Sequence, residues 1–391
     1  MKLRNALPKP ALMAATLAAI GAFSLSACVP NSTDDSKAIA VSAKDAQCKV
    51  ASASAPAGVV TFTVTNDGKD VTEFEIVAND GLRIISELEN LGPGITRDLV
   101  VRIPEGSYLA TCKPGMVGDG VVTPFTVTAS ESTIAPDTDR EAQLATASEQ
   151  YILYVKDQVQ TLVAKTDAFV TAYEAGDYDK SRELYADARV HWERIEPVAE
   201  SFGDLDPKTD AREADVAEGD PWTGWHAIEK DLWPPAGGSD LTDADRQALA
   251  EGLKTNIGTL SSEVNADDFT LDASQIGNGA QGLLDEVATS KVTGEEEAWS
   301  HTDLWDFQGN VDGAYVAFAV LRDAVNATDP DLVKTLDGRF KDLNTLLAQY
   351  GSIDDGFVLY TELTPAQVKE LSNAVDALSE PLSQLTAAAV S

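Results

Sequence analysis

Three stretches of the sequence place an acidic residue three positions from another potential metal ligand. These pairs are Glu193 with Glu196, His226 with Glu229, and Asp303 with Asp306. Residues three apart on a helix project from the same face, so both side chains of a pair can reach one cation. Because 64 of the 391 residues are acidic, such pairs also arise by chance. The spacing permits a metal site without requiring one.

The tryptophans of the chain gather around the same stretches. All six lie in the part of the sequence that holds the three histidines, His191, His226 and His301. Aromatic bulk around carboxylates would shield them from water and increase the benefit of holding a cation. Tryptophans in a helical protein also serve simply as core, so a metal centre and an ordinary packed core both remain open.

The charge of the chain limits its partners. Against 64 Asp and Glu there are 29 Lys and Arg, which gives a formal net charge of −35. Such a chain repels phosphate backbones and anionic headgroups, so its charge disfavours nucleic-acid recognition and electrostatic adsorption to membranes. With 43% apolar residues the chain can still build a sizeable core. Cations are its natural partners.

The first 27 residues are typical of an export signal. A basic start precedes the apolar run 11–23, which is short for a membrane span, and Leu25-Ser26-Ala27-Cys28 follows. This stretch resembles the lipobox of bacterial lipoproteins, in which the cysteine receives a lipid and becomes the new N-terminus. We therefore expect an exported lipoprotein, anchored by Cys28 to the outer face of a membrane at the cell surface or in the periplasm. A plain secretory signal is the alternative.

The rest of the chain divides into two domains. Residues 28–45 predict a tether, and residues 46–128 alternate with period two between turn signals about ten residues apart, which is typical of a β-sandwich. Residues 129–140 predict a linker, and residues 141–391 have the apolar spacing of an all-α domain. Helices are expected near 141–175, 178–201, 222–231, 241–263, 272–290, 296–327, 329–350 and 364–388.

Three motifs of the helical part together resemble one family. The segments 193–207, 224–233 and 300–313 are similar, in this order, to the EfeO group of imelysin-like proteins, which were also classed as M75 peptidases. The resemblance covers the whole mature chain. It implies a multidomain protein, with a cupredoxin-like β-sandwich before an all-α imelysin-like helical domain. It also implies the extracytoplasmic iron-binding component of an iron uptake system, working with a membrane permease and a haem peroxidase.

The resemblance further implies a metal site in the helical domain. The family's motif falls on His226 and Glu229, with Glu193, Glu196 and Asp210 as its acidic complement. Several carboxylates with one imidazole suit a hard ion such as iron, and a trivalent ion gains most from several negative charges. We expect iron, with Fe³⁺ the first choice over Fe²⁺.

The sandwich has a possible site of its own. The family pattern offers Cys48, Glu75, Cys112 and Met116 as ligands for copper or iron. A blue-copper centre is excluded because such centres use two histidines and this region has none. Two cysteines in an oxidising compartment equally predict a disulfide, and Glu75 would then be an ordinary exposed strand acid.

Two other classes of function stay open. A zinc metallopeptidase of the M75 type would use His226, Glu229 and one further histidine around zinc, with an open coordination position. A non-metal surface interaction module would use its acids only as solvated faces. Binding of iron, cleavage of peptides, or neither, distinguishes the three.

Overall fold

The computed structural model describes residues 38–130, 138–216, 219–289 and 291–391. The expected signal peptide, the lipid-bearing Cys28 and the beginning of the tether lie outside these residues. Within the described ranges, no helix combines the length and the hydropathy that crossing a bilayer requires.

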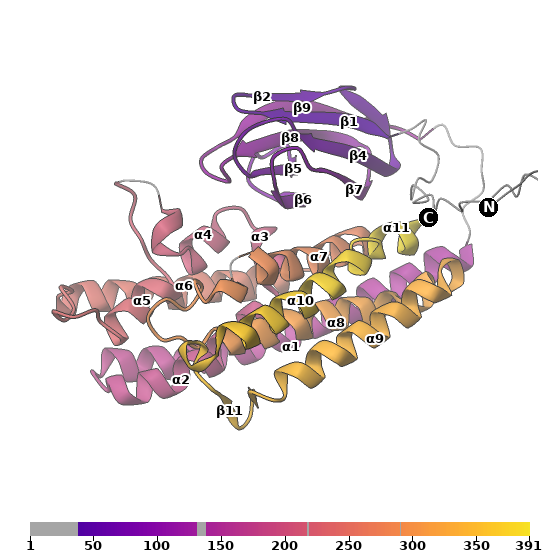
Figure 1. The fold of residues 1–391 in the computed structure, drawn as a ribbon. Helices are drawn as coiled ribbons and strands as arrows, with labels where there is room; N and C mark the ends of the chain where they lie inside the picture. Colours follow the sequence, from indigo (N-terminus) through magenta and orange to yellow (C-terminus); the bar gives the residue numbers. More distant parts are fainter. Residues whose placement is uncertain (1–37, 131–137, 217–218, 290) are drawn as a thin grey trace, which may run out of the picture. The chain divides into compact units, whose positions relative to one another are not determined.

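The first domain is the expected β-sandwich (Figure 1). One sheet has the strand order β2-β1-β4-β7 and the other β3-β9-β8-β5-β6. The strands are β1 Ile39–Lys44, β2 Gln47–Val50, β3 Ser54–Pro56, β4 Gly58–Asn66, β5 Thr72–Ala78, β6 Ile84–Leu91, β7 Thr96–Ile103, β8 Gly106–Pro114 and β9 Val121–Thr128.

Aromatic side chains join the two sheets. Phe62 of β4 contacts Phe74 of β5 and Phe125 of β9, with ring centroids 5.4 and 5.3 Å apart. All three rings are buried, and β4 belongs to one sheet while β5 and β9 belong to the other. Tilted and edge-on ring contacts of this kind add to the burial of apolar area. The apolar side chains that alternate along β4 therefore face the core between the two sheets, as the sequence predicts.

The sandwich begins earlier than expected. The predicted tether reached residue 45, but β1 already occupies Ile39–Lys44 and pairs in parallel with β4, with Ile39 opposite Phe62. The prediction was wrong because the buried face of β1 is short and partly alanine, so its period of two is faint in the sequence. Only the partner strand shows that this segment belongs to a sheet.

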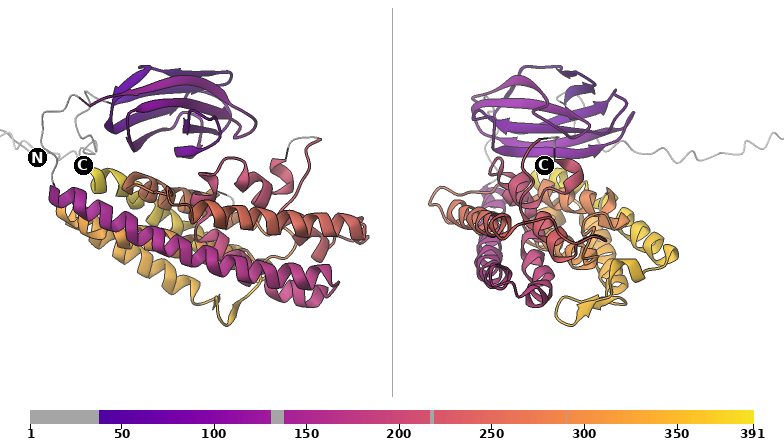
Figure 2. Two further views of the ribbon diagram at one scale, coloured as in Figure 1. Left: turned by 180° about the vertical axis from the view of Figure 1, so that it is seen from behind. Right: turned by 90° about the vertical axis from the view of Figure 1, so that its left-hand side faces the viewer.

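The second domain is largely helical, as predicted. In Figures 1 and 2 the long helices of this domain lie side by side. Helix α1 packs against α2, α6 and α8, α8 also packs against α7 and α9, and α9 packs against α10. The helices are α1 Thr138–Glu174, α2 Tyr178–Glu193, α3 Glu196–Glu200, α4 Leu205–Asp210, α5 Trp225–Leu232, α6 Asp243–Val264, α7 Ala273–Thr289, α8 Asp303–Thr328, α9 Pro330–Leu347, α10 Pro365–Leu382 and α11 Leu385–Val390, with 3-10 turns η1 Glu213–Asp215, η2 Lys291–Thr293 and η3 Tyr360–Glu362.

Several predicted boundaries were wrong. The predicted linker reached residue 140, but α1 already begins at Thr138. Helix α4 and a small hairpin, β10 Gly351–Ser352 with β11 Gly356–Phe357, were not predicted, and the hairpin means that the domain is not purely helical. Each is a short element with too few residues to show a period.

The start of α8 also differs from the prediction, and this difference changes the candidate site. A helix was predicted from residue 296, but α8 begins at Asp303. Residues 296–300 form turns, and Asp303 Oδ1 accepts a hydrogen bond from the backbone N–H of Glu297 at 3.1 Å. Because these residues are not helical, Glu296 and Glu297 turn into the interior of the domain, where both are buried.

Two glycines of α8 let this helix approach the end of α2. A Cβ atom at Gly309 would lie 2.7 Å from Glu193 Cβ, and one at Gly313 would lie 2.4 Å from the carbonyl oxygen of Arg194. No side chain fits at these distances. The two glycines therefore bring the acidic residues of α8 and α2 together.

We expect Gly313→Ala to lower the free energy of unfolding by about 1–3 kcal/mol, because the added methyl group must push α8 away from α2. The measurement is urea unfolding followed by circular dichroism. Gly338→Ala on α9 is the control: nothing lies within 4 Å of its Cβ, so the better helix propensity of alanine should raise stability by up to about 1 kcal/mol. Equal stability of Gly313→Ala and the wild type would contradict the close approach.

Candidate metal centre

Helix α5 carries the predicted histidine and glutamate. The residue before it, Gly224, has φ +88°, and a Cβ atom there would lie 2.0 Å from the carbonyl oxygen of Thr209. This contact requires glycine, and it packs the N-terminus of α5 against α4. Asp210, the last residue of α4, thereby comes close to His226, in the first turn of α5.

Acidic side chains surround the imidazole of His226. Its Nδ1 atom lies 3.2 Å from Glu229 Oε2 and 4.0 Å from Glu297 Oε1. Its Nε2 atom lies 3.5 Å from Asp210 Oδ1 and 3.4 Å from Glu296 Oε1. All five residues are buried. Two sets of potential ligands therefore share one histidine.

The Nε2 side of the ring has the geometry of an ion site. Among the described residues, no group makes a hydrogen bond to Nε2, although two carboxylates flank it. Ligand atoms of Asp210, His226 and Glu296 lie within 4.8 Å of one another, and so do those of His226, Glu229 and Glu297. A ring nitrogen without a hydrogen bond beside carboxylate oxygens fits a metal ion, which accepts both kinds of ligand.

Backbone groups and the imidazole hold Glu229 in its charged form. Its Oε1 atom accepts hydrogen bonds from the backbone N–H groups of Trp299 at 2.9 Å and Ser300 at 2.7 Å. Burial opposes the charge, but the hydrogen bond and charge of His226 and these two N–H groups outweigh it and hold the pKa of Glu229 below its usual value.

The imidazole of His226 is protonated when no ion is bound. Burial and the charge of Arg189 oppose the proton, but the hydrogen bond with Glu229, the nearby carboxylate of Glu296 and the charge of Asp210 raise the pKa of His226 to about 10. A metal ion takes a ring nitrogen only from the neutral imidazole, so binding there would release this proton.

Arg189 of α2 is the main positive charge of the cluster. The side chain is completely buried. Its guanidinium lies 2.7 Å from Glu193, 2.9 Å from Glu296 and 2.7 Å from Glu297, and it also pairs with Asp210. A buried charge with several partners is tolerated where an isolated one would not be.

The carboxylates nevertheless outnumber the cations. Burial, followed by repulsion from Glu229, raises the pKa of Glu297 well above its usual value. Burial, followed by the charge of Glu297, does the same for Asp306 of α8. No described group donates a hydrogen bond to either oxygen of Asp306, although Arg189 Nε lies 3.3 Å from Oδ1. The interior therefore carries more negative potential than its own cations neutralise.

The predicted ligands separate into two neighbouring groups. His226, Glu229 and Asp210 come together as expected. Glu193 and Glu196 instead form a group with Asp210, in which ligand atoms lie within 4.8 Å of one another. The two groups meet at Asp210.

Sequence reasoning missed Glu296 and Glu297, which supply ligand atoms at His226, and Arg189 and Lys291, which compensate the charge. Three consecutive glutamates at 295–297, just before a motif already singled out, were the available signal. A continuous helix from 296 would have placed these two neighbours about 100° apart around its axis, so only the non-helical turn brings both to one imidazole.

The sandwich does not form the expected cysteine site. Cys48 and Cys112 make a disulfide, with Cα atoms 5.4 Å apart, so neither thiolate is free to bind copper or iron. Met116 lies in a turn with φ +56°. The disulfide alternative holds for the cysteines.

Glu75 is buried, so its expected exposure was wrong. Only 2% of the residue is accessible, and Lys113 Nζ donates a hydrogen bond to its Oε1 atom at 2.5 Å. Burial, then the hydrogen bond and charge of Glu73, raise the pKa of Glu75 to about 8. Strand β5 is buried on both faces, which a period of two does not predict. The potential ligand group here is Glu73, Glu87 and Glu89 instead.

The other two histidines do not reach the cluster. His191 Nδ1 donates to Gln158 Oε1 at 2.8 Å, and His301 has φ +60° in the turn before α8. Within the described ranges, no group of potential metal ligands contains a second histidine. The two-histidine zinc site of a metallopeptidase, which the sequence left open, is therefore not formed.

Known proteins resemble the chain along nearly all of its length. The imelysin family (peptidase M75) matches residues 147–385, and the cupredoxin-like domain matches residues 15–123. The chain is 35% identical over 373 residues to the iron uptake system component EfeO of Escherichia coli (strain K12), which covers 94% of this chain and 95% of that protein. The same protein of Shigella flexneri matches with equal identity and coverage. The chain belongs to the EfeO family.

Family membership confirms the expected resemblance and domain order. In this member of the EfeO family, a cupredoxin-like β-sandwich precedes a largely helical imelysin domain. The helical domain holds the buried cluster around His226, and the sandwich holds a disulfide.

We expect His191 to make stability depend on pH. Burial, followed by the charge of Arg194, lowers the pKa of His191 to about 4, against about 6.5 in the unfolded chain. As the pH falls through 6.5, His191 therefore binds a proton in the unfolded chain but stays neutral in the folded chain. Stability decreases from about pH 6.5 downward and levels off below about pH 4.

The measurement compares the free energy of unfolding of the wild type and His191→Asn between pH 7 and pH 4. Because the ring is partly exposed, we expect the wild type to lose about 2 kcal/mol more than the variant over this range. Parallel curves for the two proteins would contradict a buried neutral His191.

Proposed function

We propose that this protein is the iron-binding component of an iron uptake system, and that its helical domain holds the ion at His226. Asp210 and Glu296 flank one ring nitrogen, while Glu229 and Glu297 lie beside the other. The observation that carries the proposal is the buried Nε2 atom, which faces two carboxylates and makes no hydrogen bond within the described part of the chain.

The charge of the site favours a multivalent cation. Burying carboxylates without enough cations is costly, and burial, followed by repulsion from Glu229, raises the pKa of Glu297 well above its usual value. An added ion of charge two or three would offset this repulsion. Carboxylate oxygens with one imidazole suit iron better than a soft ion, and Fe³⁺ gains most from the charge. The relatives named as iron uptake components support iron as the cargo.

We expect one ion per chain at this centre, bound through His226. Equilibrium dialysis of the mature chain against the nitrilotriacetate complex of Fe³⁺, with iron measured by mass spectrometry, gives stoichiometry and affinity. His226→Gln and Glu297→Gln should each weaken binding by about 100-fold or more. Titrations with Zn²⁺ and Ca²⁺ test selectivity.

His191→Asn is the matched control, because it removes a histidine of the same domain that lies outside the ligand groups. It should bind iron as the wild type does. Unchanged affinity in His226→Gln would reject this centre, and tighter binding of Zn²⁺ than of iron would reject iron as the cargo.

We further propose that the protein is an exported lipoprotein, anchored through Cys28, which delivers iron to a membrane permease and works with a haem peroxidase of the same system. The lipobox-like Leu25-Ser26-Ala27-Cys28 and the basic, apolar segment before it support the anchor. A tethered carrier would stay at high local concentration beside a permease in the same membrane.

We expect the wild type, expressed in a lipoprotein-processing bacterium, to incorporate an alkyne-labelled fatty acid and to sediment with membranes. Cys28→Ala removes the thiol that would take the lipid, so it should lose both properties. Ser32→Ala, four residues further on, is the control and should keep both. A Cys28→Ala protein that still carries the label would refute the anchor.

A further inference from the structure

Lys291 places an ammonium group where a metal ion could sit. The residue is 1% exposed, and its Nζ atom lies 2.6 Å from Glu193 Oε2, 3.0 Å from Glu196 Oε2 and 2.9 Å from Glu286 Oε2. Three carboxylates thus contact one ammonium group, and one of them, Glu193, also lies 2.7 Å from Arg189. An ordinary ion pair needs only one of them.

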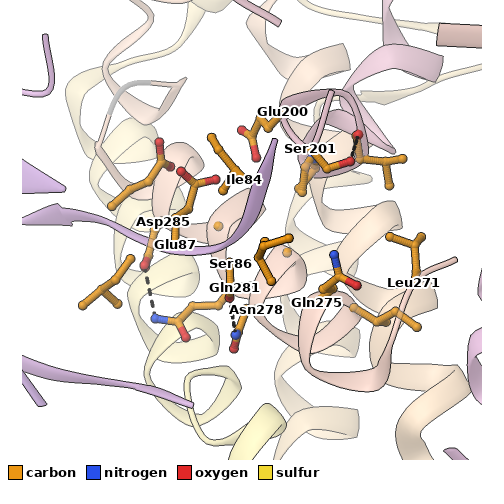
Figure 3. A pocket seen from close by; sticks show the side chains of 18 of the residues that line it. Ile84, Ser86, Glu87, Glu200, Ser201, Leu271, Gln275, Asn278, Gln281 and Asp285 are labelled. Carbon is orange, nitrogen blue, oxygen red and sulfur yellow. Dashed lines mark hydrogen bonds between the residues drawn. The ribbon is translucent and has the colours of Figure 1, made fainter. Parts of the chain in front are cut away.

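Separate elements bring the three carboxylates together. Glu193 ends α2, Glu196 begins α3 and Glu286 lies on α7, while Lys291 begins η2. The residue before Glu286 is held by two hydrogen bonds. Asp285 accepts one from Gln281 at 3.4 Å (Figure 3) and one from Ser379 of α10 at 2.9 Å. These contacts hold the segment of α7 that carries Glu286.

A buried oxygen beside this group has no partner. Asn310 of α8 is 0% exposed, and its Nδ2 atom donates to the carbonyl oxygen of Glu193 at 2.9 Å and lies 3.5 Å from Glu196 Oε2. Its Oδ1 atom accepts no hydrogen bond from any described group. An amide oxygen is a suitable ligand for a hard cation and cannot bind the proton that a carboxylate would.

The group also communicates with solvent. The Glu286 side chain is 18% exposed. An ion from solvent could therefore reach the carboxylates around Lys291 at Glu286.

We propose that Glu193, Glu196 and Glu286 form a second, weaker position for a hard metal ion, and that Lys291 is the resident counter-ion which keeps this position closed. The inference rests on the proposed function, since it concerns the same ion. A divalent or trivalent ion at this position displaces the ammonium, because three carboxylates attract two or three charges more strongly than one. No covalent bond changes in this exchange.

Lys291→Met tests the proposal directly. Methionine keeps much of the length of the alkyl chain and removes the charge. In equilibrium dialysis against the nitrilotriacetate complex of Fe³⁺, we expect this variant to bind one more ion per chain than the wild type. Lys291→Arg keeps the charge and should bind as the wild type does. Lys254→Met, which removes an exposed lysine paired with Asp167, is the matched control and should gain nothing.

The acids can be tested in the same background. Adding Glu193→Gln and Glu196→Gln to Lys291→Met should abolish the extra ion, because two of its three carboxylates are gone. An extra ion that survives these changes would place it elsewhere and overturn the assignment. So would a folded Lys291→Met chain, checked by circular dichroism, that binds no more iron than the wild type.

A measurement on the wild type avoids any dependence on the folding of the variant. Lysine acetylation by acetic anhydride, mapped by mass spectrometry, is compared without iron, with one equivalent of the Fe³⁺ complex and with an excess. We expect Lys291 to stay protected until the excess and then to react at least about tenfold faster, as a group released from burial does. Equal protection of Lys291 at all three iron levels overturns the proposal.

Two different results distinguish failure of the second position at Lys291 from failure of the centre at His226. If the wild type binds one ion and Lys291→Met gains none, the second position is rejected and the centre at His226 stands. If the wild type binds no ion tightly while Lys291→Met gains one, the centre at His226 is rejected and the second position stands.

Discussion

The helical domain depends on the compensation of buried negative charge. Its interior holds more carboxylates than an apolar core tolerates, and among the described residues the opposing charges that are fully buried are Arg189, Lys291 and a protonated His226. Removing one partner of such a network leaves an unpaired buried charge, which costs several kcal/mol. The domain is stable because each of these cations contacts more than one acid. The domain can gain a metal ion because its own cations compensate the negative charge only in part.

Incomplete compensation connects the fold to the chemistry. A fully neutralised interior would give an entering ion little to gain, whereas this one offers carboxylates that repel one another and an imidazole nitrogen without a hydrogen bond. Glycines at two contacts between helices help to bring these acids together. Gly309 and Gly313 let α8 approach α2, and Gly224 lets α5 approach α4. Each contact brings acids of different elements to one place, where no single helix could supply them all.

The sequence predicted the two domains and part of the candidate metal centre, but it missed some element boundaries and two of the acids around His226. The two domains and the pair His226/Glu229 follow from patterns that span a few residues, such as a period of two, a period of 3.6 and a spacing of three. The strand β1 and the start of α8 were missed because short segments carry no period of their own. Glu296 and Glu297 were missed with them, since their approach to His226 depends on a turn where a helix was predicted.

The sequence by itself determined which potential metal ligands are present and which of them lie three residues apart on one helix. The i, i+3 geometry of a helix does not depend on tertiary structure. The sequence also determined that the cysteines could pair or bind metal, without choosing between them. The tertiary structure decided that they form a disulfide, that Glu75 is buried, and that Asp210, Glu296 and Glu297 join His226. Those outcomes depend on the packing of segments far apart in the chain, and a carboxylate on one segment acquires its pKa and its partners only when another segment covers it.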